Sequence, residues 1–233
     1  MRGSPRRCLV KLSGEALKGA EGAFSPDALN RIAGEIAPLS LEIAIVVGGG
    51  NVIRGAKSPW LGRVQADTLG MLATVLNALA LKSYLEAAGR SVIIQSAVHT
   101  ELTDPIDPRK AVAALEAGSI VIFAGGTGSP LVTTDTAAAI RGVAIGADLL
   151  VKGSNVAGVY DKDPSEHEDA TLLQDVSYDE YLTHRYGVMD QVAVEICREH
   201  RLPIEVFDLS EENALARIAA GERTGTRISR ECP

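Results

Sequence analysis

The sequence predicts an α/β fold in which a mostly parallel sheet carries helices on both faces. Three observations support this fold. Short apolar runs alternate with helical patterns along the 233 residues, and glycine-rich turns follow three of these runs. Aromatic residues make up only 4% of the chain, whereas small and aliphatic residues are abundant. Buried parallel strands packed against small-residue helices have this composition.

The N-terminal part contains four expected strands, with a helix after each. The strands are the apolar runs Cys8 to Leu12, Glu42 to Val47, Ser91 to Ser96, and Ile120 to Ala124. The helices are Pro26 to about Pro38, Thr68 to Ala88, Pro108 to Ala117, and Asp135 to Ile145. Ser25 is a suitable N-cap before the first helix, and a glycine directly follows each of the other three.

The C-terminal part begins with an expected strand, Asp148 to Lys152, after which the pattern changes. Residues 156–171 predict a short hairpin or loop. The remaining elements are helices at Tyr178 to His184, Asp190 to His200 and Asn213 to Ala220, and a strand at Ile204 to Asp208. Because no flexible linker interrupts the chain, we expect residues 7–229 to form a single domain after a flexible tail, residues 1–6.

Composition narrows the classes of function. The net charge is -7, with 30 acidic and 23 basic residues, which argues against a nucleic-acid or anionic-membrane partner. The three cysteines are far apart in the sequence, and the four histidines lack metal-ligand spacing, so we expect neither a disulfide framework nor a protein-bound metal. We also expect no membrane span and a cytoplasmic location.

The three glycine turns predict a phosphate-binding edge of the sheet. They are KLSGE from Lys11, GGGN from Gly48, and GGTGSP from Gly125. Glycine lets backbone N–H groups approach a polyanion closely, and a lysine at a strand end can neutralise a transferring phosphoryl group. The alternatives for the first two turns are a surface lysine beside an ordinary turn and a tight connector.

Polar residues around these turns add candidate roles. Arg54 follows the second turn and suits a bidentate phosphate contact. Asp135 follows the third turn, where it can cap a helix, orient a lysine or help to bind Mg²⁺. The segment from Lys152 to Asp163 combines a cation, an aromatic ring and carboxylates that can hold a nucleoside; its alternative is a hydrophilic hairpin.

These motifs resemble those of the bacterial UMP kinases, within the amino-acid kinase superfamily. The matching segments are KLSGE, VVGGGNVIRG, DTLGMLATVLNALAL, FAGGTGSPLVTTDTAA and VYDKDP, in the family's order across residues 7–229. The resemblance implies a three-layer αβα sandwich with a mainly parallel, eight-stranded central sheet. It also implies transfer of the ATP γ-phosphoryl group to UMP, a need for Mg²⁺, a cytoplasmic homohexamer, activation by GTP and inhibition by UTP.

The resemblance also assigns roles to residues. Residues 7–150 would form the acceptor-binding part and residues 151–229 the ATP-binding part. The catalytic residues would be Lys11, Arg54, Asp135 and Lys152. ATP would be bound by Lys11, Leu12, Ser13, Gly14, Gly50, Arg54, Ser154, Tyr160 and Asp163. UMP would be bound by Gly49, Asp67, Thr127, Gly128, Ser129, Pro130, Leu131, Val132, Thr133 and Thr134. The GTP effector segment would be Gly19, Ala20, Glu21, Gly22, Ala23 and Phe24.

Three departures from the family pattern and two alternatives remain. The loop Ala56 to Gln65 is short and carries Trp60, Ala157 replaces a usual aspartate, and the stretch His99 to Pro108 differs from the usual one before the third glycine turn. The same sheet and glycine turns would suit kinases of acetylglutamate, glutamate, aspartate, carbamate or isopentenyl phosphate, although these would lack TGSPLVTTD and GMLAT. The chain could also be a nucleotide-binding regulator without turnover, which the presence of Lys11, Arg54 and Asp135 argues against.

Overall fold

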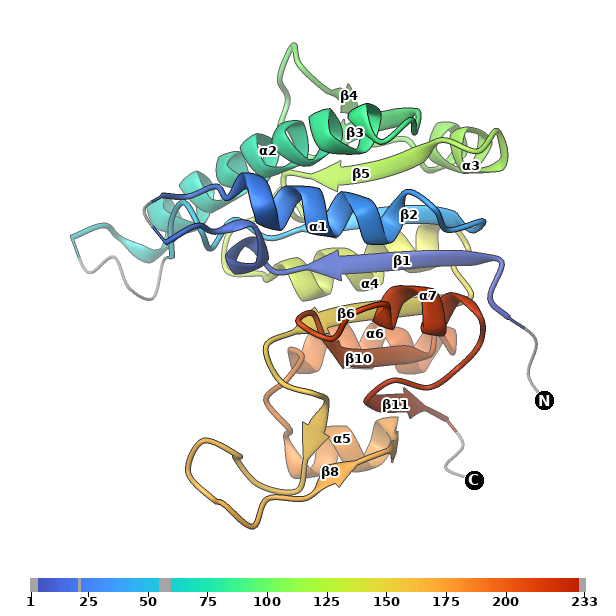
Figure 1. Ribbon diagram of the computed structural model, residues 1–233. Coiled ribbons are helices and arrows are strands. Elements are labelled where there is room, and N and C mark those ends of the chain that lie inside the picture. The colour runs from blue at the N-terminus through green and yellow to red at the C-terminus, as the bar shows by residue number, and fades with distance from the viewer. Residues whose placement is uncertain (1–3, 21, 55–59, 231–233) are drawn as a thin grey trace.

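The computed structural model describes residues 4–20, 22–54 and 60–230. In this part of the chain a nine-stranded sheet forms the centre of the molecule (Figure 1). Its strands, in spatial order, are β4 (Asp104–Pro105), β3 (Val92–Ser96), β5 (Ile120–Ala124), β2 (Glu42–Val47), β1 (Arg7–Leu12), β6 (Leu149–Ser154), β10 (Ile204–Asp208), β11 (Thr226–Ser229) and β9 (Asp175–Ser177). Neighbouring strands are parallel except for β10 and β11.

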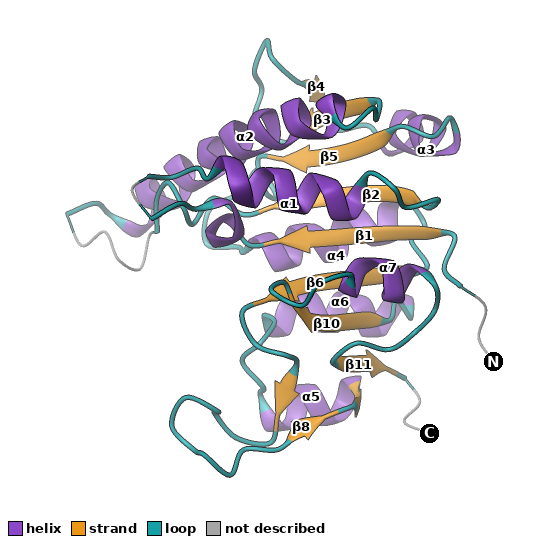
Figure 2. Ribbon diagram, in the orientation of Figure 1, coloured by secondary structure: helices purple, strands orange, loops and turns teal. Residues whose placement is uncertain are grey.

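Helices cover both faces of the sheet, which confirms the expected three-layer sandwich (Figure 2). The front layer contains the 3₁₀ helix η1 (Gly14–Leu17), α1 (Pro26–Ile36), α2 (Arg63–Ala87) and α7 (Ala214–Ala219). The rear layer contains α3 (Pro108–Glu116), α4 (Thr134–Ala144), α5 (Tyr178–His184) and α6 (Gln191–His200).

Alternation along the strands supplies a separate core to each layer. In β1, Val10 belongs to the front core, with α1 and α2, whereas Leu9 belongs to the rear core, with α3, α4 and α6. Both side chains are at most 2% exposed. Because side chains point alternately to opposite faces, a strand buried on both sides reads as a continuous apolar run.

Local signals in the sequence explain most helix starts. Ser25 Oγ accepts a hydrogen bond from Ala28 N at 3.2 Å, and Pro26 is the first helical residue of α1. Asp107 and Thr133 cap α3 and α4 in the same way. Capping was one of the roles predicted for Asp135. In the structure Thr133 caps α4 instead, and Asp135 lies in the first turn of this helix.

Several elements differ from the expectation. The helix α2 begins at Arg63, five residues before the predicted start, because its N-cap Gly62 has no side chain to signal a helix start. The sheet has nine strands where the resemblance implied eight, and β4, β9 and β11 are short strands that no apolar run marks. A hairpin of β7 (Val159–Tyr160) and β8 (Leu172–Leu173) confirms one of the two structures expected after residue 156.

The length and composition of α2 correct another expectation. Its 25 residues are long and apolar enough to cross a membrane, although the sequence was expected to contain no such stretch. The inner face of α2 packs on β3 and β5 and beside α1. Core helices of soluble proteins satisfy the same length and composition test, so α2 is weak evidence for a membrane span.

Candidate active site

The first two glycine turns pack directly against each other at the carboxyl edge of the sheet. A Cβ atom at Gly14 would lie only 2.6 Å from both the backbone nitrogen of Gly50 and Asn51 Oδ1. Gly48 N also donates to Leu12 O at 2.8 Å. No side chain fits at Gly14 without moving the second turn, so these glycines are needed for close approach of two backbone segments.

The third turn needs glycine for two reasons. Gly125 has a φ of +75°, in the left-handed region, and a Cβ atom there would lie 2.6 Å from Val98 N. Gly125 N donates to Thr74 Oγ1 at 2.7 Å, which ties this turn to α2. The third turn is therefore held between α2 and the segment after β3.

Two lysines share one carboxylate behind these turns. Lys11 on β1 and Lys152 on β6 are register partners, so both side chains leave the same face of the sheet, toward α4. Lys11 Nζ lies 2.7 Å from Asp135 Oδ1, and Lys152 Nζ contacts Asp135 Oδ2. All three side chains are largely buried, with exposed fractions of 11%, 8% and 10% for Lys11, Lys152 and Asp135.

The pKa values in this cluster follow from burial and charge. Burial alone would raise the pKa of Asp135, but the charges of Lys11 and Lys152 outweigh it and hold that pKa below its ordinary value. Burial, together with the charge of Lys11, lowers the pKa of Lys152 to about 8, against the opposing effect of Asp135. At pH 7 the Asp135 carboxylate is therefore ionised and Lys152 is mainly protonated. Two lysines against one carboxylate give the cluster a net positive formal charge.

Asp190 extends this cluster, and the sequence interpretation assigned it no role beyond a helix start. Its carboxylate caps α6, accepts from Thr136 Oγ1 at 2.9 and 3.0 Å, and contacts the Thr133 hydroxyl. Its backbone N–H points to Asp135 Oδ2 at 3.4 Å. Asp190 thus fixes the start of α4, from which Asp135 projects. Only contacts across 54 to 57 residues reveal this role.

Thr74 and Asn77, on the inner face of α2, were also missed. Asn77 Nδ2 donates to Gly48 O at 2.6 Å and to Asn51 Oδ1 at 2.7 Å, while Asn51 Nδ2 donates back to Asn77 Oδ1 at 2.9 Å. Thr74 holds the third turn through Gly125. The motif GMLAT had indicated this helix without indicating that Thr74 and Asn77 fix two different turns.

A small pocket of about 130 Å³ lies between α2 and the second and third turns. Six predicted acceptor residues and one predicted ATP residue line it. The acceptor residues are Gly49, Asp67, Thr127, Ser129, Val132 and Thr134, and the ATP residue is Gly50. Asp67 Oδ2 accepts from Leu131 N at 2.9 Å, and Arg63 Nε lies 3.0 Å from both carboxylate oxygens. Leu131 has a φ of +68°, so Asp67 supports an unusual backbone conformation.

A larger pocket of about 1110 Å³ lies at the β7–β8 hairpin. Ser154, Tyr160 and Asp163, the predicted nucleoside residues, all line it. The rings of His184 and Tyr186 also line this pocket and are stacked, with centroids 5.5 Å apart and planes 9° apart. The expected ATP residues therefore form two separate sets. The residues expected to bind the ATP phosphates lie near the glycine turns, and those expected to bind the nucleoside line this pocket.

The other predicted site residues have the following positions. Leu12 is fully buried in the front core, so only its backbone can face a ligand. Ser13 caps η1, and Arg54 lies against Gly50 with its Nε 3.1 Å from Glu15 Oε1. Gly128 has a φ of +84°. Pro130 lies in the third turn beside the exposed Leu131.

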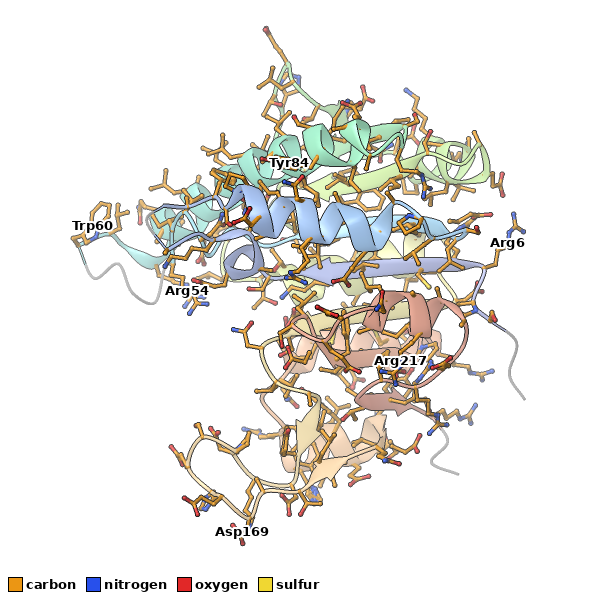
Figure 3. All side chains as sticks on the ribbon, viewed as in Figure 1. Arg6, Arg54, Trp60, Tyr84, Asp169 and Arg217 are labelled. Atoms are coloured by element: carbon orange, nitrogen blue, oxygen red, sulfur yellow. The ribbon has the colours of Figure 1, made fainter. Side chains whose placement is uncertain are left out.

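The expected effector segment lies beside the second turn. Ala23 O accepts from Asn51 Nδ2 at 2.7 Å, and Gly19 N donates to Gly22 O at 3.0 Å. Ala20 and Phe24 are exposed, whereas Glu21 lies outside the described residues. Of the short loop Ala56 to Gln65, residues 56–59 also lie outside the described part, and Trp60 is 75% exposed on the same side as Arg54 (Figure 3).

Comparison with known proteins agrees with this architecture. Residues 6–208 match the amino acid kinase family. A uridylate kinase from Psychrobacter cryohalolentis is 44% identical, covering 95% of each chain, and one from Xanthomonas euvesicatoria is 44% identical, covering 97% of each. The crystal structure of UMP kinase from Bacillus anthracis superposes with a TM-score of 0.94, at 34% identity and 98% coverage of each chain. The chain therefore belongs to the amino acid kinase family, in the branch that contains the uridylate kinases.

Proposed function

We propose that this protein is a UMP kinase, which transfers the γ-phosphoryl group of ATP to UMP and gives UDP. One observation carries the proposal: two buried ammonium groups, Lys11 and Lys152, converge on Asp135 beside glycine turns that present backbone N–H groups. The named relatives and the acceptor motif TGSPLVTTD support UMP over the other acceptors of the superfamily.

The chemistry requires positioning and charge neutralisation rather than a protein nucleophile. The phosphate of UMP is the nucleophile, and it is already largely ionised at neutral pH because its second pKa is near 6. Negative charge spreads over the transferring phosphoryl group, and fixed cations stabilise that charge. Lys11 and Lys152 are the fixed cations, and ionised Asp135 keeps them from diverging under their mutual repulsion.

The two pockets divide the substrates. UMP occupies the pocket between α2 and the third turn, with Asp67 next to the ribose and residues 127–134 around the nucleotide. ATP places its nucleoside in the pocket at the β7–β8 hairpin and its phosphates over Lys11, Ser13, Gly14, Gly50 and Arg54. Ser154 follows Lys152 by two residues on β6, so the donor pocket leads directly toward the lysines.

Mg²⁺ fits this site as an ion carried by the phosphates of ATP. Within the described ranges, no group of three histidine, cysteine or acidic side chains could hold a metal. Mg²⁺ usually keeps several waters and binds one or two carboxylates together with substrate phosphates. Asp135 is the carboxylate that would face the ion, which would neutralise phosphate charge when bound.

The proposal also includes a cytoplasmic location, activation by GTP and inhibition by UTP.

The proposal further includes assembly into a homohexamer. The outer face of α2 supports assembly, because it carries an exposed stripe of Leu69, Leu72 and Leu76, with exposed fractions of 41%, 43% and 51%. Light scattering of Leu76→Glu tests this role, with Leu102→Glu, an exposed leucine outside α2, as the control. A smaller particle for the first variant alone is expected; unchanged mass for both contradicts it.

An acceptor assay tests the activity itself. Consumption of ATP is measured with UMP, CMP, acetylglutamate and carbamate as separate acceptors, in the presence of Mg²⁺. Turnover with UMP alone is the expected result. Turnover with another acceptor would assign the chain to a different branch of the superfamily, and no turnover with any acceptor would support a regulator.

A further inference from the structure

A third cavity lies behind the acceptor turn and shares no lining residue with the two nucleotide pockets. It has a volume of about 330 Å³ and lies at the edge of the sheet where β3 and β4 end. Ser96, Thr100, Thr103 and Arg141 provide polar groups in its wall. A cavity of this size is at the lower end of the range for small-molecule sites.

Arg141, in α4, lacks a partner in the described part of the chain. Its Nε atom is buried without a hydrogen bond, and no carboxylate in residues 4–20, 22–54 or 60–230 forms an ion pair with it. Burial alone lowers the pKa of Arg141, without an opposing effect from any acidic group. A guanidinium in such surroundings carries an uncompensated desolvation cost, which a bound anion would offset.

Two hydroxyl groups add to the donors in the cavity. Thr100 Oγ1 and Thr103 Oγ1 lie 2.9 Å apart, so one hydroxyl donates a hydrogen bond to the other. The O–H of the accepting hydroxyl can then donate to a ligand. The Ser96 hydroxyl is not available as a donor to a ligand, because its Oγ donates to Val98 O at 2.7 Å. The cavity wall also contains Asp104, whose exposed carboxylate is not paired with Arg141 in the described structure.

We propose that this cavity binds a small oxyanion, a phosphate group, between Arg141 and the Thr100–Thr103 hydroxyl pair. The site goes beyond the proposed kinase reaction, since none of its residues lies in the acceptor or donor pocket. Its wall touches the acceptor turn: the backbone nitrogens of Ala97 and Val98 crowd Gly125, and Ala97 lies against Gly128. A bound phosphate group therefore stabilises the segment that supports the third turn.

Thermal unfolding in increasing inorganic phosphate tests the proposal. The samples are the wild type, Arg141→Met, and the control Arg109→Gln, which removes an exposed positive charge near the cavity without altering its wall. Phosphate that binds at the glycine turns raises Tm equally in all three. The expected result is a larger rise for the wild type and the control, with phosphate affinity at the cavity at least about tenfold weaker in Arg141→Met. Equal rises in all three overturn the proposal.

A crystal soaked in selenate locates the anion and remains informative if Arg141→Met folds poorly. Anomalous density beside Arg141 supports the proposal, whereas an empty cavity, or a carboxylate of a neighbouring subunit in it, overturns it. Titration with UTP separates the two sources of a phosphate group. Equal UTP affinity in the wild type and Arg141→Lys indicates free phosphate, and weaker UTP binding in Arg141→Lys indicates the phosphate of a nucleotide.

Discussion

Lys11 and Lys152 occupy directly paired positions on neighbouring parallel strands, and their ammonium groups bind opposite oxygens of one carboxylate. Two like charges on adjacent strands would repel each other if nothing lay between them. Asp135 compensates for this repulsion while leaving a net positive charge at the carboxyl edge of the sheet.

The low pKa of Lys152 predicts that activity falls as the pH rises. Lys152 stabilises phosphate charge only in its protonated form, and its pKa is lowered to about 8, first by burial and then by Lys11. The pH profile of kcat/KM for ATP should therefore bend downward above about pH 8. In Lys152→Arg the bend should move to higher pH, because a guanidinium stays protonated. Lys82→Arg, on α2, is the control that should keep the original bend.

Asp135→Asn should reduce both stability and turnover. The change leaves two buried ammonium groups without their shared counter-charge, which should destabilise the protein by about 3–5 kcal/mol. Denaturant unfolding and kcat measure the two effects. Asp179→Asn removes one partner of the exposed pair with Arg198 and should cost about 1 kcal/mol or less. Similar, small losses in the two variants would contradict the structural account of Asp135.

Thr74→Val should weaken UMP binding. Valine has nearly the shape of threonine but cannot accept the hydrogen bond from Gly125 N, so the third turn loses its attachment to α2. An unsatisfied buried N–H group costs about 1–3 kcal/mol, and we expect KM for UMP to rise by about tenfold or more while KM for ATP changes little. Thr68→Val is the matched control, since Thr68 donates only to Val64 O within the same helix. An equal effect on both substrates would contradict this role.

Two glycine substitutions should have opposite outcomes. In Gly14→Ala, the new Cβ atom would displace the second turn, and a shift of this kind should reduce kcat/KM by roughly 10²-fold. Gly34→Ala lies in α1 with open space around the new atom, so it should raise the free energy of unfolding by roughly 0.5–1 kcal/mol with normal activity. Kinetics and denaturant unfolding of both variants distinguish a requirement for close approach from a general effect of losing glycine.

The sequence predicted the elements whose local signals are strong. The apolar runs of β2, β5 and β10 and the helix α5 have the expected bounds, because each buries a continuous set of side chains or has a clear cap. The start of α2 could not be predicted from Gly62, which offers no capping side chain. The strands β9 and β11 have the short sequences DVS and TRIS, and they become strands only through tertiary pairing: β11 pairs with β10 and β9, and β9 pairs with β11.

The candidate site shows the same division. Lys11, Asp135 and the glycine turns were predicted because lysines, carboxylates and glycines next to a strand end are typical of phosphate-binding sites. Asp190 and Asn77 act through hydrogen bonds to segments 54 and 29 residues away, so their roles depend on tertiary packing. The oxyanion cavity around Arg141 has no sequence motif at all.

The kinetics of Lys11→Ala test the central claim most directly, since they ask whether this buried cation stabilises the transferring phosphoryl group. Lys18→Ala, which removes an exposed lysine 3.9 Å from Glu15, is the control. We predict that kcat with ATP and UMP falls by roughly 10²–10³ or more in Lys11→Ala while the fold stays intact by circular dichroism. A normal kcat accompanied by a lower Tm would contradict the account and leave Lys11 with a purely structural role.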